Sequence, residues 1–178
     1  QAKAVIESRP LPTKIYRPGQ SQSIAGNKVK SLTPGAASNT VGGPVSIAEL
    51  TRALRNDPDL IFEWVFNNVE NHITYGLQKG GLGALIDGWG NSFDQSDLLV
   101  QLFRQAGLSA NYVNGTLRMN GAQAAAWLGT DPSDVGTAYQ VLINCVVPVD
   151  LFYTGTEYVI DFSHTWVKVT IGGTDYYF

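Results

Sequence analysis

Apolar residues recur at helical spacing in one segment near the middle of the chain. After Ser92, one face of the predicted helix collects Leu98, Leu99, Leu102, Phe103 and Ala106. Gly90 precedes the segment and predicts a turn, and Gly107 has the position of a left-handed C-terminal cap. The pattern predicts an amphipathic helix whose first turn presents free N–H groups and the positive end of the helix dipole.

Two segments before this helix predict shorter helices. Ser46 and Glu49 have the spacing of a capping box, which starts the first of them. Asp57 and Pro58 supply an N-cap and a proline at the first helical position of the second. The apolar stripe of this second helix is formed by Leu60, Ile61, Trp64, Val65 and Val69.

A glycine-rich segment, residues 78–83, lies between the second helix and the central one. It lacks the Lys-Ser/Thr ending of a phosphate-binding P-loop, and no strand clearly precedes it. We therefore expect a loop with a conformational role, which leads through residues 84–86 into the turn at Gly90.

The next part of the chain predicts strands around a pair of helices. A strand over 108–113, a turn at Asn114–Gly115 and a returning strand over 116–119 come first. Two helices follow, one that stops at Gly129 and one that is capped within 131–134, and we expect them to form an insertion between strands. Residues 145–149 have the composition of a short buried strand.

The last part predicts β-structure. Strand-forming residues occupy 158–162 and 164–171, a two-residue hairpin turn follows at Gly172–Gly173, and a returning strand covers 174–178. Helices therefore come first and an antiparallel sheet after them. This order indicates an α+β fold in which the central helix packs on the sheet.

Charge is unevenly distributed along the chain. Residues 1–45 contain six basic residues and one acidic residue among many Pro, Gly and Ser, whereas residues 46–178 contain six basic and fourteen acidic residues. We interpret 1–45 as an extended basic arm or linker, which either lies on the acidic body or stays solvated, and 46–178 as one domain. The net charge of −3 argues against nucleic acid as a general partner, and we expect no membrane span.

Two short motifs give the chain a resemblance to a known family. A Cys-x-Asp/Glu-x-Ala/Ser-x-Leu pattern at the start of a helix is matched in order by Ser92, Asp94, Ser96 and Leu98. A His-x-Trp-Val-x-Val strand starts at His164. Both resemble the transglutaminase-like (papain-like cysteine) superfamily, over roughly residues 60–178. This chain departs from the family pattern at the nucleophile position, where it has Ser92 in place of cysteine.

The resemblance implies an acyl-transfer site on a transglutaminase-like fold. Ser92 occupies the nucleophile position, His164 would be the general base, and an acid just after the next strand would orient the imidazole. No cofactor is implied, because this chemistry needs none. With one cysteine and two histidines in the chain, we also expect no metal site.

The hairpin allows the position of this acid to be counted. The turn pairs Trp166 with the residue after Phe178, which would lie diagonally beside His164. Asp175 pairs with a residue too far along the strand from His164, and Asp161 points to the face opposite His164. Neither is therefore expected to be the acid. We therefore expect the transglutaminase-like domain to be truncated just before it.

Ser92 has three explanations. The domain could keep the fold without the chemistry, the serine could be an engineered replacement of cysteine, or it could be a working nucleophile. The third is the weakest, because the pKa of a serine hydroxyl is far above that of a thiol. Residues 90–95 are similar to a bacterial branch of the superfamily, often joined to large secreted repeat proteins, in which this position is not reliably cysteine.

These interpretations lead to two functions. With cysteine at position 92, the resemblance implies action on peptide or isopeptide amides of a protein substrate, by hydrolysis or transfer to an amine. The alternative is a catalytically inactive interaction or structural module, whose partner is the rest of a larger secreted or cell-envelope bacterial protein. With Ser92 and without the acid, the chain as it stands is expected to be inactive.

Three other residues have structural interpretations. Cys145 follows a helix and precedes two valines, so we expect a small core residue. His72 lies near a helix end, where a local cap interaction is expected. Trp89 is expected in the core, with a cleft beside Ser92 as the alternative.

Overall fold

The computed structural model describes residues 46–178, and the predicted basic arm lies outside the described residues. The helices are α1 Ile47–Ala53, α2 Pro58–Asn68, α3 Gly80–Asp87, α4 Ser92–Gln105, α5 Gly121–Leu128 and α6 Val135–Asn144. The strands are β1 Glu70–Asn71, β2 Trp89–Gly90, β3 Ser109–Asn120, β4 Val149–Tyr153, β5 Tyr158–Ile171 and β6 Thr174–Tyr177. The protein is therefore a mixed α+β structure, as the order of the predicted elements indicated.

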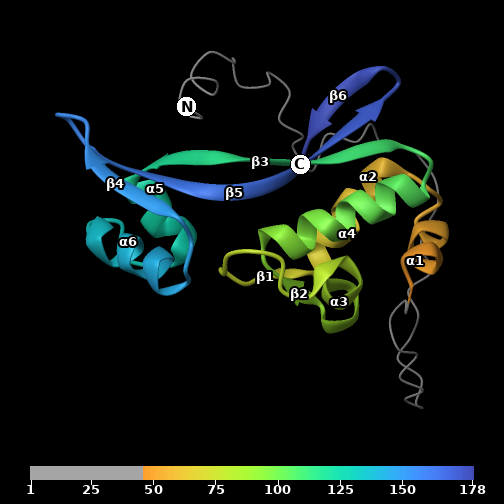
Figure 1. Cartoon of the computed structure of the whole chain (residues 1–178), viewed down its shortest axis with the longest axis horizontal. Coiled ribbons are helices and arrows are strands. Elements are labelled where there is room, and N and C mark those ends of the chain that lie inside the picture. Colours follow the sequence, from red (N-terminus) through yellow and green to blue (C-terminus); the bar gives the residue numbers. More distant parts are fainter. Residues whose placement is uncertain (1–45) are drawn as a thin grey trace, which may run out of the picture.

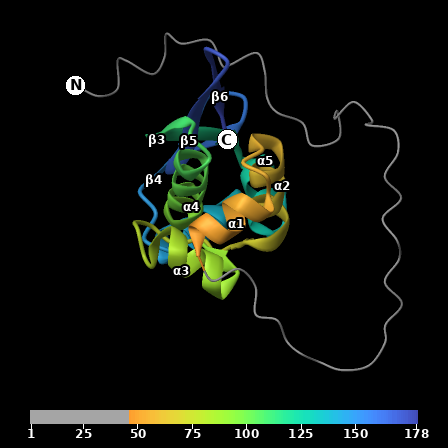
Figure 2. The ribbon, with the colours of Figure 1, turned by 90° about the vertical axis from the view of Figure 1, so that its right-hand side faces the viewer.

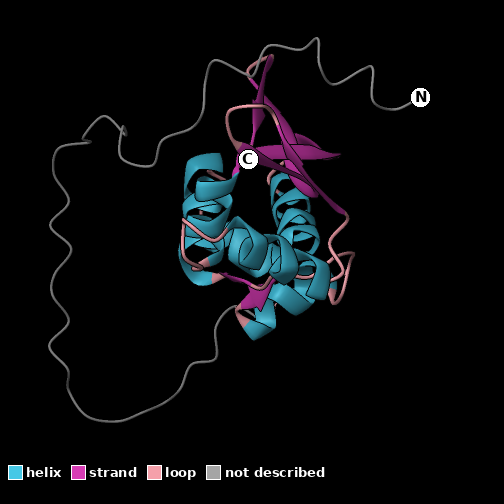
Figure 3. Cartoon of the chain, turned by 90° about the vertical axis from the view of Figure 1, so that its left-hand side faces the viewer, coloured by secondary structure: helices cyan, strands magenta, loops and turns pink. Residues whose placement is uncertain are grey.

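Strand β5 is the centre of the larger sheet. It pairs with β3 over residues 159–170, and on its other side first with β4 and then with β6, always antiparallel. The short strands β1 and β2 pair in parallel apart from this sheet. Figure 1 shows β3 and β5 as a long ribbon with the helices below it, and Figure 3 shows the same separation of helices and larger sheet from the side.

Local sequence patterns account for the helix starts. Ser46 accepts a hydrogen bond from the Glu49 N–H at the start of α1, and the Asp57 side chain caps α2, with Pro58 as its first residue. The central helix α4 ends as predicted, with Gly107 in the left-handed region at φ +84°. Figure 2 shows α4 below the strands, with α1, α2 and α3 beside it.

The glycine-rich segment is a helix, not the predicted loop. Helix α3 starts at Gly80 and covers most of that segment. A Cβ on Gly81 would lie 2.7 Å from the backbone N and Cα of Leu98 in α4. The glycine therefore allows the two helices to approach at backbone contact, a requirement that propensity along the chain does not reveal.

The predicted turn at Asn114–Gly115 is also wrong, because β3 runs straight through it. Gly115 pairs with His164 in an uninterrupted antiparallel register. A Cβ at Gly115 would lie 3.1 Å from the ring of Trp166, so this glycine makes room for a side chain of the neighbouring strand. The continuous pairing of β3 with β5 replaces the local turn that Asn-Gly favours.

The strand predicted over 145–149 begins only at Val149. Helix α6 continues to Asn144, Cys145 follows it as C-cap, and Val146 has φ +60°. Cys145 is partly buried and packs against the core beside α5 and α6, as expected.

Two hydrophobic cores lie along the ribbon. Helices α1 to α4 pack with Val167 and Val169 of β5, whereas α5 and α6 pack with Ile160 and Phe162. Neighbouring strand residues point to opposite faces, so the two cores use opposite faces of β5. Both helix groups nevertheless lie below the ribbon in Figure 1, because the ribbon twists between them. His164 lies in the stretch where the face changes.

The contact between α3 and α4 can be tested with a matched pair of glycines. Gly81→Ala should lower the free energy of unfolding by about 1–3 kcal/mol, because the methyl group meets backbone atoms that cannot move aside. Gly136, also the second residue of its helix, has only the Asp134 Oδ1 atom nearby, at 3.4 Å. Gly136→Ala should be neutral or stabilising by up to about 1 kcal/mol. Urea denaturation measures both variants, and equal losses of unfolding free energy would show that the close approach of α3 and α4 does not require Gly81.

Candidate functional site

Ser92 is the first residue of α4, and its neighbour Asn91 fixes the start of the helix. The Asn91 side chain accepts the N–H groups of Phe93 and Asp94 at 2.9 and 3.0 Å. Its amide group donates to Thr74 Oγ1 at 2.9 Å and to the Gly76 carbonyl at 2.7 Å. Asn91 is only 2 % exposed, so one buried side chain ties the helix start to the preceding loop.

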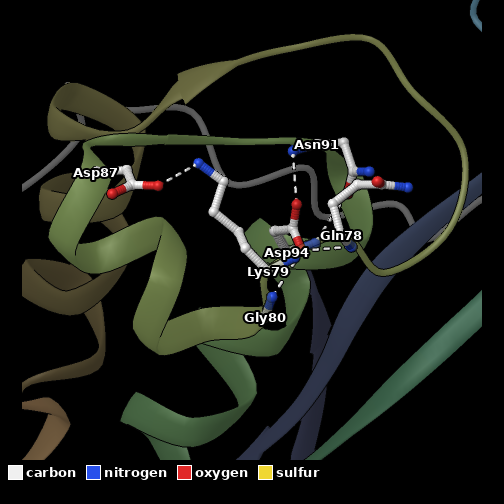
Figure 4. A network of polar contacts seen from close by, with 6 residues as sticks. All are labelled: Gln78, Lys79, Gly80, Asp87, Asn91 and Asp94. Carbon is white, nitrogen blue, oxygen red and sulfur yellow. Dashed lines mark hydrogen bonds and ion pairs between the residues drawn. The ribbon is translucent and has the colours of Figure 1, made fainter.

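A buried carboxylate two residues after Ser92 holds the rest of that loop. Asp94 Oδ1 accepts the backbone N–H groups of Gln78, Lys79 and Gly80 at 3.0, 3.0 and 2.9 Å, and Oδ2 accepts that of Asn91 at 3.3 Å (Figure 4). Asp94 is fully buried. The start of α3 is therefore fixed to the start of α4 by one side chain.

His164 lies near the middle of β5. Its ring lies between those of Phe162 and Trp166, with centroids at 6.2 and 5.8 Å. Burial lowers the pKa of His164 below its ordinary value of 6.5, because a charged imidazole would lose its hydration. The imidazole is therefore neutral at neutral pH, the form that accepts a proton.

Ser92 and His164, which come from opposite halves of the described chain, line the same pocket. The walls are formed by residues 71–75, Ser92, Phe93, Trp127, Leu142, Val147 and residues 162–164. The space between these walls is about 20 Å³, room for about one water molecule, and it is open to solvent on one side. No Asp, Glu, Lys or Arg is among these wall residues, and within residues 46–178 no hydrogen bond joins Ser92 to His164.

The two aspartates discounted from the sequence are engaged elsewhere. Asp175 pairs with Thr170 in the β5–β6 register and forms an ion pair with Lys168 at 2.6 Å. Asp161 forms a bidentate pair with Arg118 at 2.7 Å. The hairpin register agrees with the count made from the sequence, since Phe178 exchanges backbone hydrogen bonds with Val167.

Two sequence predictions for this region are wrong. Trp89 lies neither in the core nor in the pocket wall. It is 40 % exposed, its ring stacks on that of His72 at 4.5 Å, and the Lys79 ammonium group lies over it. His72 is not a helix cap. It pairs through its backbone N–H with the Gly90 carbonyl and lines the pocket.

The sequence also gave no indication of one wall of the pocket. Trp127 and Leu142 come from the helices interpreted as an insertion, and Trp127 stacks on Phe162 at 5.3 Å. Only the twist of the ribbon brings these helices opposite the start of α4. No local pattern marks Trp127 as a wall residue, because its partner Phe162 is distant in the sequence.

The described residues hold no group of three or more His, Cys, Asp or Glu arranged to bind a metal ion. No helix within 46–178 has the length and apolar character needed to cross a membrane. A comparison of the chain with protein-family models, with curated proteins and with solved structures found no match. What the structure establishes is therefore a mixed α+β domain with helices on one side of an antiparallel sheet.

The Asp94 network predicts an unequal cost for two aspartates of the same region. Asp94→Ala should lower the free energy of unfolding by about 2–4 kcal/mol, because buried N–H groups lose a charged acceptor. Asp87→Ala removes only the exposed partner of Lys79 and should cost less than about 1 kcal/mol. Urea denaturation followed by tryptophan fluorescence measures both, and similar costs would show that the carboxylate is not a structural centre.

The partly buried imidazole of His164 predicts a pH dependence of stability. The unfolded chain binds a proton at His164 near pH 6.5, whereas the folded chain binds it only at lower pH. Stability should therefore fall as the pH decreases from 6.5 through the lowered pKa. His164→Gln cannot titrate and should show a weaker decrease over the same range. If the urea midpoints of the unsubstituted protein and of His164→Gln changed in parallel between about pH 7.5 and pH 5, His164 would not be the source of the pH dependence.

Proposed function

We propose that the pocket is a transglutaminase-like site for peptide or isopeptide amides, with position 92 as the nucleophile position and His164 as the general base. The observation that carries the proposal is that both residues line one pocket. The two motifs that resemble the superfamily are the segments that contribute them. The substrate would be a protein or peptide segment.

The first turn of α4 supports this role. Asn91 satisfies the N–H groups of Phe93 and Asp94 through its side chain and that of Gln95 through its carbonyl. No hydrogen bond within residues 46–178 joins the Ser92 N–H to an acceptor. A free N–H at the positive end of a helix dipole stabilises a thiolate or an oxyanion.

The reaction requires a thiol at position 92. His164 takes the thiol proton, the thiolate attacks the amide carbonyl, and the resulting imidazolium protonates the departing amine as the C–N bond breaks. Water or a second amine then attacks the thioester and releases the thiol. A carboxylate or amide from a segment after Phe178 would orient the imidazole, since in the observed register the next position lies opposite Trp166.

Ser92 itself favours a second function for the chain with this sequence. A serine hydroxyl is not ionised at neutral pH, so it gains little from the helix dipole. The surface around the pocket mouth would then bind a peptide segment, or a segment of a larger parent chain, without cleaving it, with at most a small group entering the space itself.

Replacement of Ser92 by cysteine tests the proposal. The parent is the full chain with Ser92→Cys and Cys145→Ala, and the matched control carries Ser109→Cys, an exposed serine at the start of β3. Alkylation by iodoacetamide is measured at about pH 6.5 and pH 9. An ordinary thiol with a pKa of about 8.5 is only about 1 % ionised at the lower pH. The rate at about pH 6.5 divided by the rate at about pH 9 should be at least about tenfold higher for Cys at position 92 than for the control.

Histidine variants complete the test. His164→Gln should remove most of the excess rate at the lower pH, because the thiolate loses its imidazolium partner. His72→Gln, which changes the other histidine of the pocket, should leave it unchanged. A pH profile like that of the Ser109→Cys control would exclude the acyl-transfer site and leave the binding module.

A further inference from the structure

The larger sheet has a gap beside His164. On the side of β5 opposite β3, pairing with the β4 side ends where the Ser163 N–H binds the Pro148 carbonyl at 2.9 Å. Pairing with the β6 side begins at Val167, which exchanges backbone hydrogen bonds with Phe178. Between these points no strand of the described residues pairs with this side of β5.

Thr165 lies in the middle of this gap. Backbone groups of alternate residues point to the same side of a strand, so the Thr165 carbonyl points the same way as the paired groups of Ser163 and Val167. Thr165 is only 4 % exposed. Without another donor, its carbonyl would be a buried acceptor left without a strand partner, which is costly.

Helix α4 supplies the donor. Ser96 Oγ donates a hydrogen bond to the Thr165 carbonyl at 3.2 Å, and Ser96 is also only 4 % exposed. On the other side of β5, Thr165 Oγ1 donates to Asn114 Oδ1 at 2.5 Å. Thr165 is therefore held both by α4 and by β3.

The two ends of this hydrogen bond are next to the two site residues. Ser96 is one helical turn after Ser92 and lies on the same side of α4, and Thr165 directly follows His164. The position of the helix turn that carries residue 92 is thus connected, through one buried hydrogen bond, to the strand that carries the imidazole.

We propose that Ser96 is a positioning residue, which fixes the His164 strand against the first turn of α4 and so sets the approach of the imidazole to residue 92. Ser96 does not touch the reacting atoms. The inference rests on the proposed function, since it concerns the geometry of the same pair of residues.

The test uses the full chain with Ser92→Cys and Cys145→Ala as parent, and the ratio of iodoacetamide alkylation rates at about pH 6.5 and pH 9. Ser96→Ala should lower this ratio about five- to tenfold, because the imidazolium no longer lies beside the thiolate. Ser96→Thr keeps a hydroxyl group and should retain most of the ratio. Asn114→Ala is a change at an exposed residue that removes the acceptor of the Thr165 hydroxyl. It should also lower the ratio, and it tests the proposal even if Ser96→Ala does not fold.

Thr51→Val is the matched structural control. Thr51 is also a buried hydroxyl, only 1 % exposed, which donates to the Ile47 carbonyl at 2.8 Å within α1. Its loss should lower the urea midpoint but leave the rate ratio unchanged, so the ratio separates positioning from stability.

The outcomes distinguish the two proposals. A parent whose ratio depends on His164, but which keeps that ratio in both Ser96→Ala and Asn114→Ala, would overturn the role of Ser96 and leave the proposed function standing. A parent whose ratio equals that of the Ser109→Cys control would overturn the proposed function, and the role of Ser96 with it. A ratio that falls in the Ser96 and Asn114 variants but not in Thr51→Val supports both.

Discussion

The buried carboxylate of Asp94 is the constraint on which the first half of the domain depends. A fully buried charge is tolerated only when its oxygens are well supplied with donors, and this one receives four backbone N–H groups. Three of them belong to the start of α3, so α3 cannot leave α4 without exposing unsatisfied groups on both sides. The close approach of Gly81 to the backbone of Leu98 follows from the same connection.

Asn91 extends this constraint to the pocket. It binds Thr74 and Gly76, which precede α3, while Asp94 binds the residues that start α3. The loop between them therefore has both ends fixed by side chains that flank Ser92 in the sequence. The wall that contains Thr74 and the wall residue Ser92 are positioned by the same helix turn, so they cannot move independently.

Features encoded by neighbouring residues could be predicted from the sequence, and features that depend on distant contacts could not. The starts of α1 and α2, the end of α4 at Gly107 and the hairpin at Gly172–Gly173 each depend on one cap or one turn, and they were predicted. Helix α3 and the continuous strand β3 were not, because Gly81 and Gly115 are required by Leu98 and Trp166, which are distant in the sequence. Ser92 and His164 could be placed together only through a resemblance, and the wall at Trp127 not at all, because it depends on the twist of the ribbon.

The side chains that hold the start of α4 in place do not include that of Ser92. Asn91, Asp94 and Ser96 make their hydrogen bonds to backbone groups and to Thr74, whereas Ser92 Oγ makes none within residues 46–178. A hydroxyl and a thiol at position 92 would therefore meet the same helix start, the same neutral imidazole and the same aromatic wall. The hydrogen bonds that hold this pocket therefore do not depend on the atom at position 92, and the same scaffold accommodates serine or cysteine there.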